Sequence, residues 1–253
     1  MIWGVRMVID ELIEQAKNRS RGRKVKDVRA GLGYTCVMLE DSACGLAYTF
    51  RNAMGHCCGV IPDAGTLVGR DSGELISWAK EGHMLKSAIG LATINAILNN
   101  PSAAFPSGNV IQAFDVKPSE TFGMIGEFSP ILFRVKEMTG NIYVFEQEVV
   151  EGDGLYPSSQ IPELLPSCNV VVITATSIIN HSIDGILPYC KNARQVCITG
   201  PSTPICPEVF QKYNVTMLAG SVVEKPDLVL QFVSQGGGTM NMKPAIRHVL
   251  VPV

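Results

Sequence analysis

Apolar residues recur at helical spacing in three segments of the first hundred residues. Residues 5–19 carry a single apolar stripe, which predicts an amphipathic helix. Residues 72–80 and 83–99 predict two further helices, and the second is apolar nearly all round, which is typical of a buried helix. It ends at Asn99-Asn100-Pro101, a sequence that breaks helices.

Two strand-like runs lie between the first and second predicted helices. They cover residues 28–40 and 44–50, and the polar and small residues 40–43 lie between them. Apolar and β-branched runs joined by such a turn predict an antiparallel hairpin. The first half of the chain is therefore expected to be an α+β unit.

The second half alternates strand and helix patterns. Strands are predicted at 122–126, 142–145, 170–173, 195–198 and 215–218, and helices at 132–138, 182–191 and 207–212. Such alternation predicts a parallel sheet with right-handed crossovers. Residues 101–118 hold three prolines and no clear period, so we expect a linker there. The prediction is two domains, 1–105 and 106–253, in an α/β chain.

Composition narrows the class of protein. Apolar residues make up 46% of the chain and charged residues 17%, which favours a large buried core over disorder. The net charge of −2 argues against general binding to nucleic acids or anionic membranes. There is no secretory signal pattern and no apolar run of membrane-spanning length, so we expect a cytoplasmic protein with reduced cysteines.

Small polar residues follow the predicted parallel strands at their carboxyl ends. They occur in Gly123-Met124-Ile125-Gly126, at Glu146, in residues 174–180, and in Gly200-Pro201-Ser202-Thr203-Pro204. Ligands of open α/β sheets bind in the crevice beyond these ends. The sequence therefore predicts a binding site for a polar ligand there.

The first two of these segments resemble a degenerate dinucleotide fingerprint. Gly123 and Gly126 would let the chain approach a phosphate, with Gly200 assigned to the same ligand, and Glu146 would accept from ribose hydroxyls. One glycine of the usual three is missing. The alternative is tight packing of strand against helix, and the identity of any cofactor stays open.

The two later segments supply hydroxyl and amide groups. Thr174, Thr176 and Asn180 would form a polar wall, although capping of the next helix also explains these residue types. Ser202 and Thr203 would point from a stiff loop into the site, and the alternative is a rigid strand-to-helix turn.

Two neighbouring side chains have alternative readings. His181 is either a general base or a surface residue. Cys206 lies at the start of a predicted helix, whose dipole would lower the pKa of its thiol.

The soft donors of the chain do not predict a metal site. His56, Cys57 and Cys58 are adjacent in a glycine-flanked loop, but adjacent side chains rarely point at one ion. No second pair has ligand spacing. We therefore name no metal ligands, and whether a metal is bound directly stays open.

Several motifs together resemble one family. In the first half these are Gly31-Leu32-Gly33-Tyr34-Thr35, Gly45-Leu46-Ala47-Tyr48-Thr49-Phe50 and Gly90-Leu91-Ala92-Thr93-Ile94-Asn95-Ala96. In the second half they are the strand-end segments above with Leu164-Leu165-Pro166. In this order they resemble the "putative heavy-metal chelation" proteins. The resemblance implies an enolase-N-terminal-like domain, a Rossmann-like domain and an active-site cleft between them.

Two functions follow from this reading. The first is an enzyme acting on a small polar or anionic metabolite, in the synthesis or handling of a metal chelator. Its substrate would be bound by Asn95, Thr174, Thr176, Ser202 and Thr203, with Glu146 and Asn180 as catalytic residues. The second is a non-catalytic binder of a metal or metal–chelate complex, which needs several converging ligands. Whether the chain forms a homodimer stays open.

Overall fold

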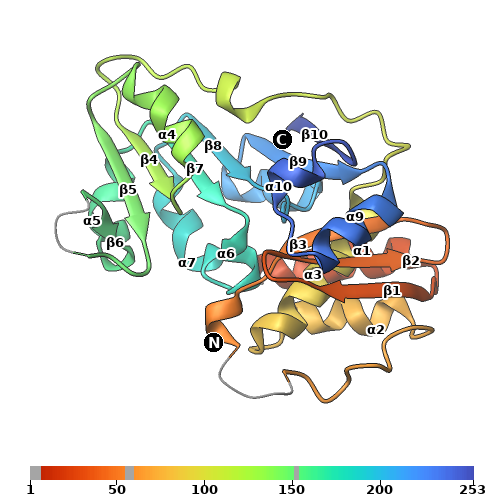
Figure 1. Ribbon diagram of the computed structural model, residues 1–253. Coiled ribbons are helices and arrows are strands. Elements are labelled where there is room, and N and C mark those ends of the chain that lie inside the picture. The colour runs from red at the N-terminus through yellow and green to blue at the C-terminus, as the bar shows by residue number, and fades with distance from the viewer. Residues whose placement is uncertain (1–6, 55–59, 151–153) are drawn as a thin grey trace.

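The computed structural model describes residues 7–54, 60–150 and 154–253, and builds them around two separate sheets (Figure 1). The smaller sheet is antiparallel, in the order β1 (Val25–Ala30), β2 (Tyr34–Leu39), β3 (Cys44–Tyr48). The larger sheet has the order β10-β9-β8-β7-β4-β5-β6. The chain is thus a mixed α/β protein with a small antiparallel and a large, mostly parallel sheet.

The small sheet is covered on both faces. On one face lie α1 (Val8–Ser20), α2 (Ser72–Ser77) and α3 (Met84–Leu98), and on the other lies α9 (Pro226–Ser234) (Figure 1). The helix α3 approaches the sheet closely at Gly45, where an added Cβ would lie 2.1 Å from the carbonyl oxygen of Ala92. The sheet therefore packs directly against α3, and nearly all of the apolar side chains of this helix are buried.

The large sheet holds six parallel strands and one antiparallel strand. The parallel strands are β4 (Phe122–Ile125), β5 (Ile142–Glu146), β6 (Tyr156–Pro157), β7 (Val170–Thr174), β8 (Gln195–Thr199) and β9 (Met217–Val223). The final strand, β10 (Ile246–Pro252), pairs antiparallel with β9. The central strands are continuous apolar runs because helices and loops cover both faces.

Short helices connect these strands. They are α4 (Ser129–Lys136), α5 (Ile161–Leu164), α6 (Thr176–Ile179), α7 (Ile183–Ile186), α8 (Pro207–Phe210) and α10 (Thr239–Met242), supplemented by 3₁₀ turns. Residues 101–121 run as an irregular segment along the top of Figure 1 from α3 to β4. Among the described residues, no helix combines the length and the apolar character needed to cross a bilayer.

One prediction of local structure is wrong. The run 28–40 is two strands, because the chain turns at Gly31-Leu32-Gly33. Gly31 is required there, since an added Cβ would lie 2.2 Å from the carbonyl oxygen of Val233 in α9. The elements predicted from the sequence end at residue 218, and the structure adds α9, α10 and β10 after it. The predicted helical start at Val5 lies outside the described residues.

Two buried amides at the C-terminal end of α3 join the two sheets. Asn99 donates from Nδ2 to the carbonyl oxygens of Thr203 and Ser221, and its Oδ1 accepts from the N–H of Ile205 at 2.8 Å. One turn earlier, Asn95 donates to the carbonyl oxygens of Leu46 and Ser202. Both side chains are buried, so these bonds hold the two halves of the chain in one fixed arrangement.

Candidate functional site

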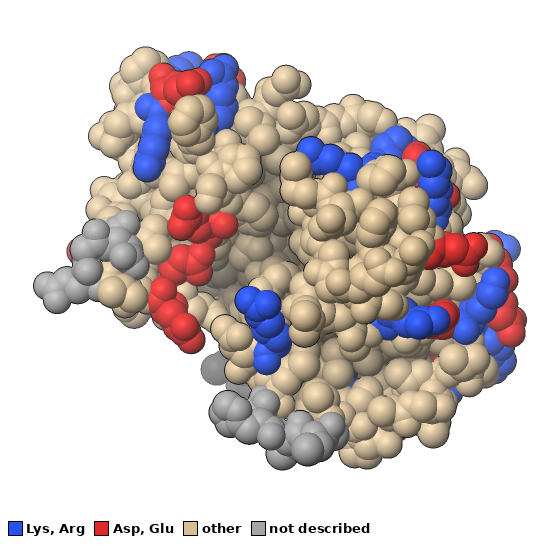
Figure 2. All heavy atoms as spheres, viewed as in Figure 1, with Lys and Arg blue, Asp and Glu red and all other residues tan. Residues whose placement is uncertain are grey.

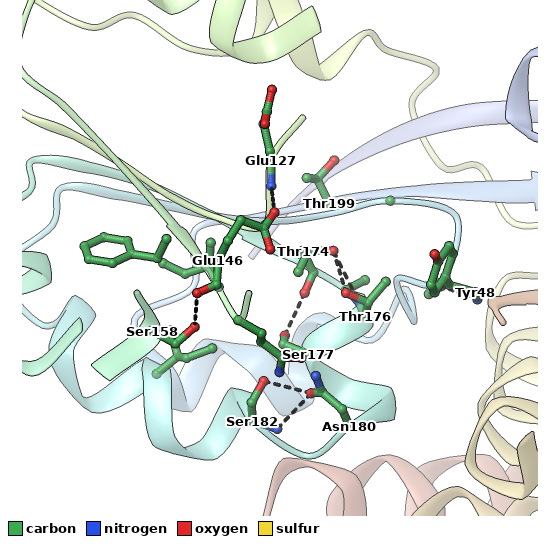
Figure 3. A pocket seen from close by; sticks show the side chains of 18 of the residues that line it. Tyr48, Glu127, Glu146, Ser158, Thr174, Thr176, Ser177, Asn180, Ser182 and Thr199 are labelled. Carbon is green, nitrogen blue, oxygen red and sulfur yellow. Dashed lines mark hydrogen bonds between the residues drawn. The ribbon is translucent and has the colours of Figure 1, made fainter. Parts of the chain in front are cut away.

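A cavity of about 710 Å³ lies at the carboxyl ends of β4, β5, β7 and β8 (Figure 3). The loops after these strands form most of its wall. Tyr34, Tyr48 and Phe50 of the small sheet and its following turn form the rest. The volume lies within the usual range of small-molecule sites, about 300–1,000 Å³.

The loop after β4 depends on a glycine with positive φ. Gly126 has φ 81°, and an added Cβ would lie 2.8 Å from Cγ2 of Thr174. Gly126 and Gly200, whose φ is 121°, both line the cavity. Gly123 does not line it and packs against Cys168 and Leu165 instead. The packing alternative therefore describes Gly123, while Gly126 and Gly200 form part of the wall.

Glu146 ends β5 and is half-buried in the cavity wall. Its Oε1 accepts a 2.6 Å hydrogen bond from the backbone N–H of Glu127, which fixes the carboxylate across the ends of two neighbouring strands (Figure 3). Its backbone carbonyl accepts from the Ser158 hydroxyl at 2.9 Å. The second carboxylate oxygen, Oε2, has no hydrogen bond within the described chain and is available to a ligand.

Hydroxyl groups follow β7 and line the cavity together. Thr174 and Thr176 place their Oγ1 atoms 2.9 Å apart, and the Ser177 hydroxyl donates to the Thr174 carbonyl oxygen at 2.6 Å (Figure 3). Thr174 ends β7 and Thr176 begins α6, and both side chains line the cavity as a hydroxyl pair. One proton of this pair is used between the two residues, and the other is available to a bound molecule.

Asn180 serves two purposes. Its Oδ1 accepts from the backbone N–H and the hydroxyl of Ser182, which stabilises the turn that leads into α7. In Figure 3 its amide nitrogen lies on the side away from Ser182, and Asn180 lines the cavity. The side chain is therefore fixed by one end and presents two N–H donors at the other.

His181 also lines the cavity and is held in an unusual conformation. It has φ 60°, and its Nε2 lies 3.2 Å from the carbonyl oxygen of Glu81. Its Nδ1 is buried without a hydrogen-bond partner in the described chain. Because a carbonyl only accepts, Nε2 carries the proton in the neutral ring and Nδ1 is left as an acceptor.

Ser202 and Thr203, the two hydroxyls expected to point into the site from the loop after β8, are both buried. The Ser202 Oγ accepts from the Tyr48 N–H at 2.8 Å, and the Thr203 hydroxyl donates to the Ala219 carbonyl oxygen. Ser202 reaches the cavity, whereas Thr203 and Asn95 are absent from its wall. The hydrogen bonds of Ser202 and Thr203 hold the loop in place. Sequence spacing alone could not distinguish this structural role from ligand binding.

The cavity wall is acidic on one side and aromatic on the other. Figure 2 shows a hollow with acidic side chains gathered along one side. Glu127 and Glu146 line it, and no Lys or Arg is among the described lining residues. Opposite, Tyr34, Tyr48 and Phe50 form successive edge-to-face contacts with ring centroids 6.0 and 5.2 Å apart. Desolvation raises the pKa of Tyr34 to about 12, so its phenol stays neutral.

The described residues contain no group of three or more His, Cys, Asp or Glu side chains arranged to hold a metal. His56, Cys57 and Cys58 lie outside the described residues. The lowered thiol pKa predicted for Cys206 is wrong: burial raises it to about 12, which outweighs any effect of the short helix that follows.

Sequence reasoning missed Glu127, Ser158 and the three aromatic residues of this site. The aromatic residues fall in motifs of the first half, and only the packing of the two sheets brings them to the ends of the parallel strands. Glu127 directly follows Gly126 and places a carboxylate in the wall of the cavity. That charge is the feature that distinguishes this wall from an anion site.

Comparisons with known proteins agree over nearly the whole chain. A family model described as "Putative heavy-metal chelation" matches residues 109–252, and a second model with the same description matches residues 9–98. An uncharacterised protein of Methanocaldococcus jannaschii is 26% identical over 98% of each chain.

Two solved structures of family members with unknown function have this fold. The one from Pyrococcus horikoshii has a TM-score of 0.85, with 22% identity over 98% of this chain and 100% of that one. The one from Desulfitobacterium hafniense has a TM-score of 0.79, with 21% identity over 96% of this chain and 99% of that one. At these identities the likeness concerns the fold alone.

Proposed function

The chain belongs to the family described as "Putative heavy-metal chelation", and from that premise we propose that it is an enzyme acting on a small polar metabolite in the cavity. The observation that carries the proposal is the Glu146 carboxylate, fixed by the Glu127 N–H with one oxygen available beside the Thr174–Thr176 hydroxyl pair. A positioned carboxylate among hydrogen-bonding groups is suited to proton transfer.

The groups around Glu146 suggest how a substrate would lie. Asn180 would donate from Nδ2 to a substrate oxygen, while Glu146 would accept from a substrate hydroxyl and act as general base. The described wall has two carboxylates and no cationic side chain, so a substrate rich in hydroxyl groups fits better than a polyanion. An anionic part would have to rely on backbone amides of the Gly126 and Gly200 loops.

The proposal also covers the type of each domain, the cellular setting and the aromatic part of the ligand. We interpret the first part of the chain as enolase-N-terminal-like and the second as Rossmann-like, with a cytoplasmic setting. A flat, aromatic part of a ligand would contact the Tyr48 and Phe50 rings, as an adenosine-type group would. The role in chelator synthesis or handling comes from the family description.

A non-catalytic binder of a metal–chelate complex is the second candidate, and the family description favours it. Incubating a small-molecule extract with the protein separates the two functions. If the protein is an enzyme, wild type consumes one metabolite and Glu146→Gln does not. Glu148 is an exposed carboxylate outside the cavity wall, so Glu148→Gln should consume the metabolite as wild type does. Retention of a metabolite without consumption supports the binder. Equal turnover by wild type and Glu146→Gln excludes the proposed base.

A further inference from the structure

Sulfur-containing side chains gather on one face of the small sheet. Cys36 and Met38 are two residues apart on β2, and Cys44 lies on β3 directly opposite Met38. Residues two apart on a strand point to the same face. These three residues belong to one buried cluster, which also contains Met242. Their neighbours Val37 and Ala47 belong to the core on the opposite face.

The spacing of the two thiols suits an ion better than a disulfide. Cys36 pairs with Leu46, so Cys36 and Cys44 are diagonal neighbours on the α9 side of the sheet. Diagonal Cβ atoms lie somewhat less than about 7–8 Å apart. A disulfide needs roughly 3.8 Å between Cβ atoms. Both cysteines are free thiols, and an ion placed between their sulfur atoms would span the wider gap.

A surface groove leads to this cluster. It has a volume of about 490 Å³, lies between β1 and α9, and includes Met38 in its lining. The carboxylates of Asp27 and Asp227 line it, as do the cations Lys26 and Arg29. Met38 is otherwise only 3% exposed. The groove therefore gives a small cation a path from solvent to the thioether.

We propose that Cys36, Cys44 and Met38 bind one soft monovalent metal ion of the Cu(I) class. Thiolate and thioether sulfurs select such ions over hard cations. Two thiol protons would leave as two thiolate–metal bonds form, so the ion and its thiolates together carry one negative charge. The site lacks the four donors that structural zinc requires.

The alternative role of these sulfurs is apolar filling of the core, for which Cys and Met are well suited. In that case they can be replaced by apolar side chains without effect on metal uptake. The site is separate from the cavity above, and its failure would leave the proposed function of the cavity intact.

Anaerobic titration of the reduced full chain with Cu(I), against a chromophoric Cu(I) chelator, tests the proposal. Wild type should remove one equivalent from the chelator. Cys36→Ala with Cys44→Ala should lose this uptake. Two matched double variants should retain it: Cys197→Ala with Cys206→Ala, which are buried in other clusters, and Cys57→Ala with Cys58→Ala.

A second measurement does not depend on the folding of the double variant. Met38→Leu conserves volume and removes one sulfur, so it should weaken uptake while leaving the melting temperature near that of wild type. X-ray absorption of the loaded wild type should show sulfur ligands only. The proposal is overturned by absence of uptake in wild type, by nitrogen or oxygen ligands, or by loss of uptake in the Cys57–Cys58 variant alone.

Discussion

Replacing Asn99 by alanine tests the buried amide connection between the two sheets. The substitution removes two donated bonds, to the Thr203 and Ser221 carbonyl oxygens, and the bond accepted from the Ile205 N–H. Asn99 is 2% exposed, so water cannot easily replace these partners. At about 1 kcal/mol for each of these three bonds, we expect a loss of about 3 kcal/mol in the free energy of unfolding.

Thermal unfolding followed by calorimetry measures this loss. For a chain of this size, each kcal/mol shifts the melting temperature by about 2–4 °C, so a fall of roughly 6–12 °C is expected. The adjacent Asn100 is the control, because it is exposed and its side chain accepts one hydrogen bond, from the Ser102 N–H. Asn100→Ala should change stability by about 0.5 kcal/mol or less. Similar shifts in both variants would refute the claim that α3 holds the sheets together.

Two further predictions concern packing and pH. Gly45→Ala should strongly lower the melting temperature, because the new Cβ would lie 2.1 Å from the Ala92 carbonyl oxygen. Gly82→Ala is the control and should leave it unchanged, because an added Cβ at Gly82 has nothing within 4 Å. Equal melting temperatures of the two variants would contradict the close approach of α3 to the sheet. Arg194 donates two hydrogen bonds to Glu120 and lowers its carboxyl pKa from 4.5 to about 2. This folded-state pKa is depressed, so the stabilisation is present above about pH 4.5 and is lost as pH falls toward 2. Glu120→Gln should therefore flatten the denaturant-midpoint profile across that window, and an unchanged slope would exclude the pair as a source of acid sensitivity.

The strands of the parallel sheet could be predicted because they are continuous apolar runs ended by Gly, Ser or Thr. Val170–Thr174 is an example, since its run is broken only where the cavity begins. The turn within residues 28–40 could not be predicted, because Gly31 is required by α9, nearly two hundred residues away in the sequence. Contacts of this range leave no local pattern.

The candidate site was predictable in part for the same reason. Glu146, Thr174, Thr176, Asn180 and Gly126 follow parallel strands, so topology alone brings them to one cavity. Thr203 and Asn95 have similar polar side chains but are used to hold a loop and a helix in place. The sequence cannot distinguish a structural role from ligand binding at such positions. The same residue type can bond a buried carbonyl or face a ligand. The aromatic wall required the packing of both sheets.

Native mass spectrometry of the full chain, purified without chelators, tests the proposed cavity most directly. The account predicts an organic adduct on wild type and on Glu148→Gln, and a reduced adduct on Glu146→Gln, because Glu146 lines the cavity and Glu148 does not. An organic adduct of equal occupancy on all three proteins, or none on wild type under gentle ionisation, would contradict it.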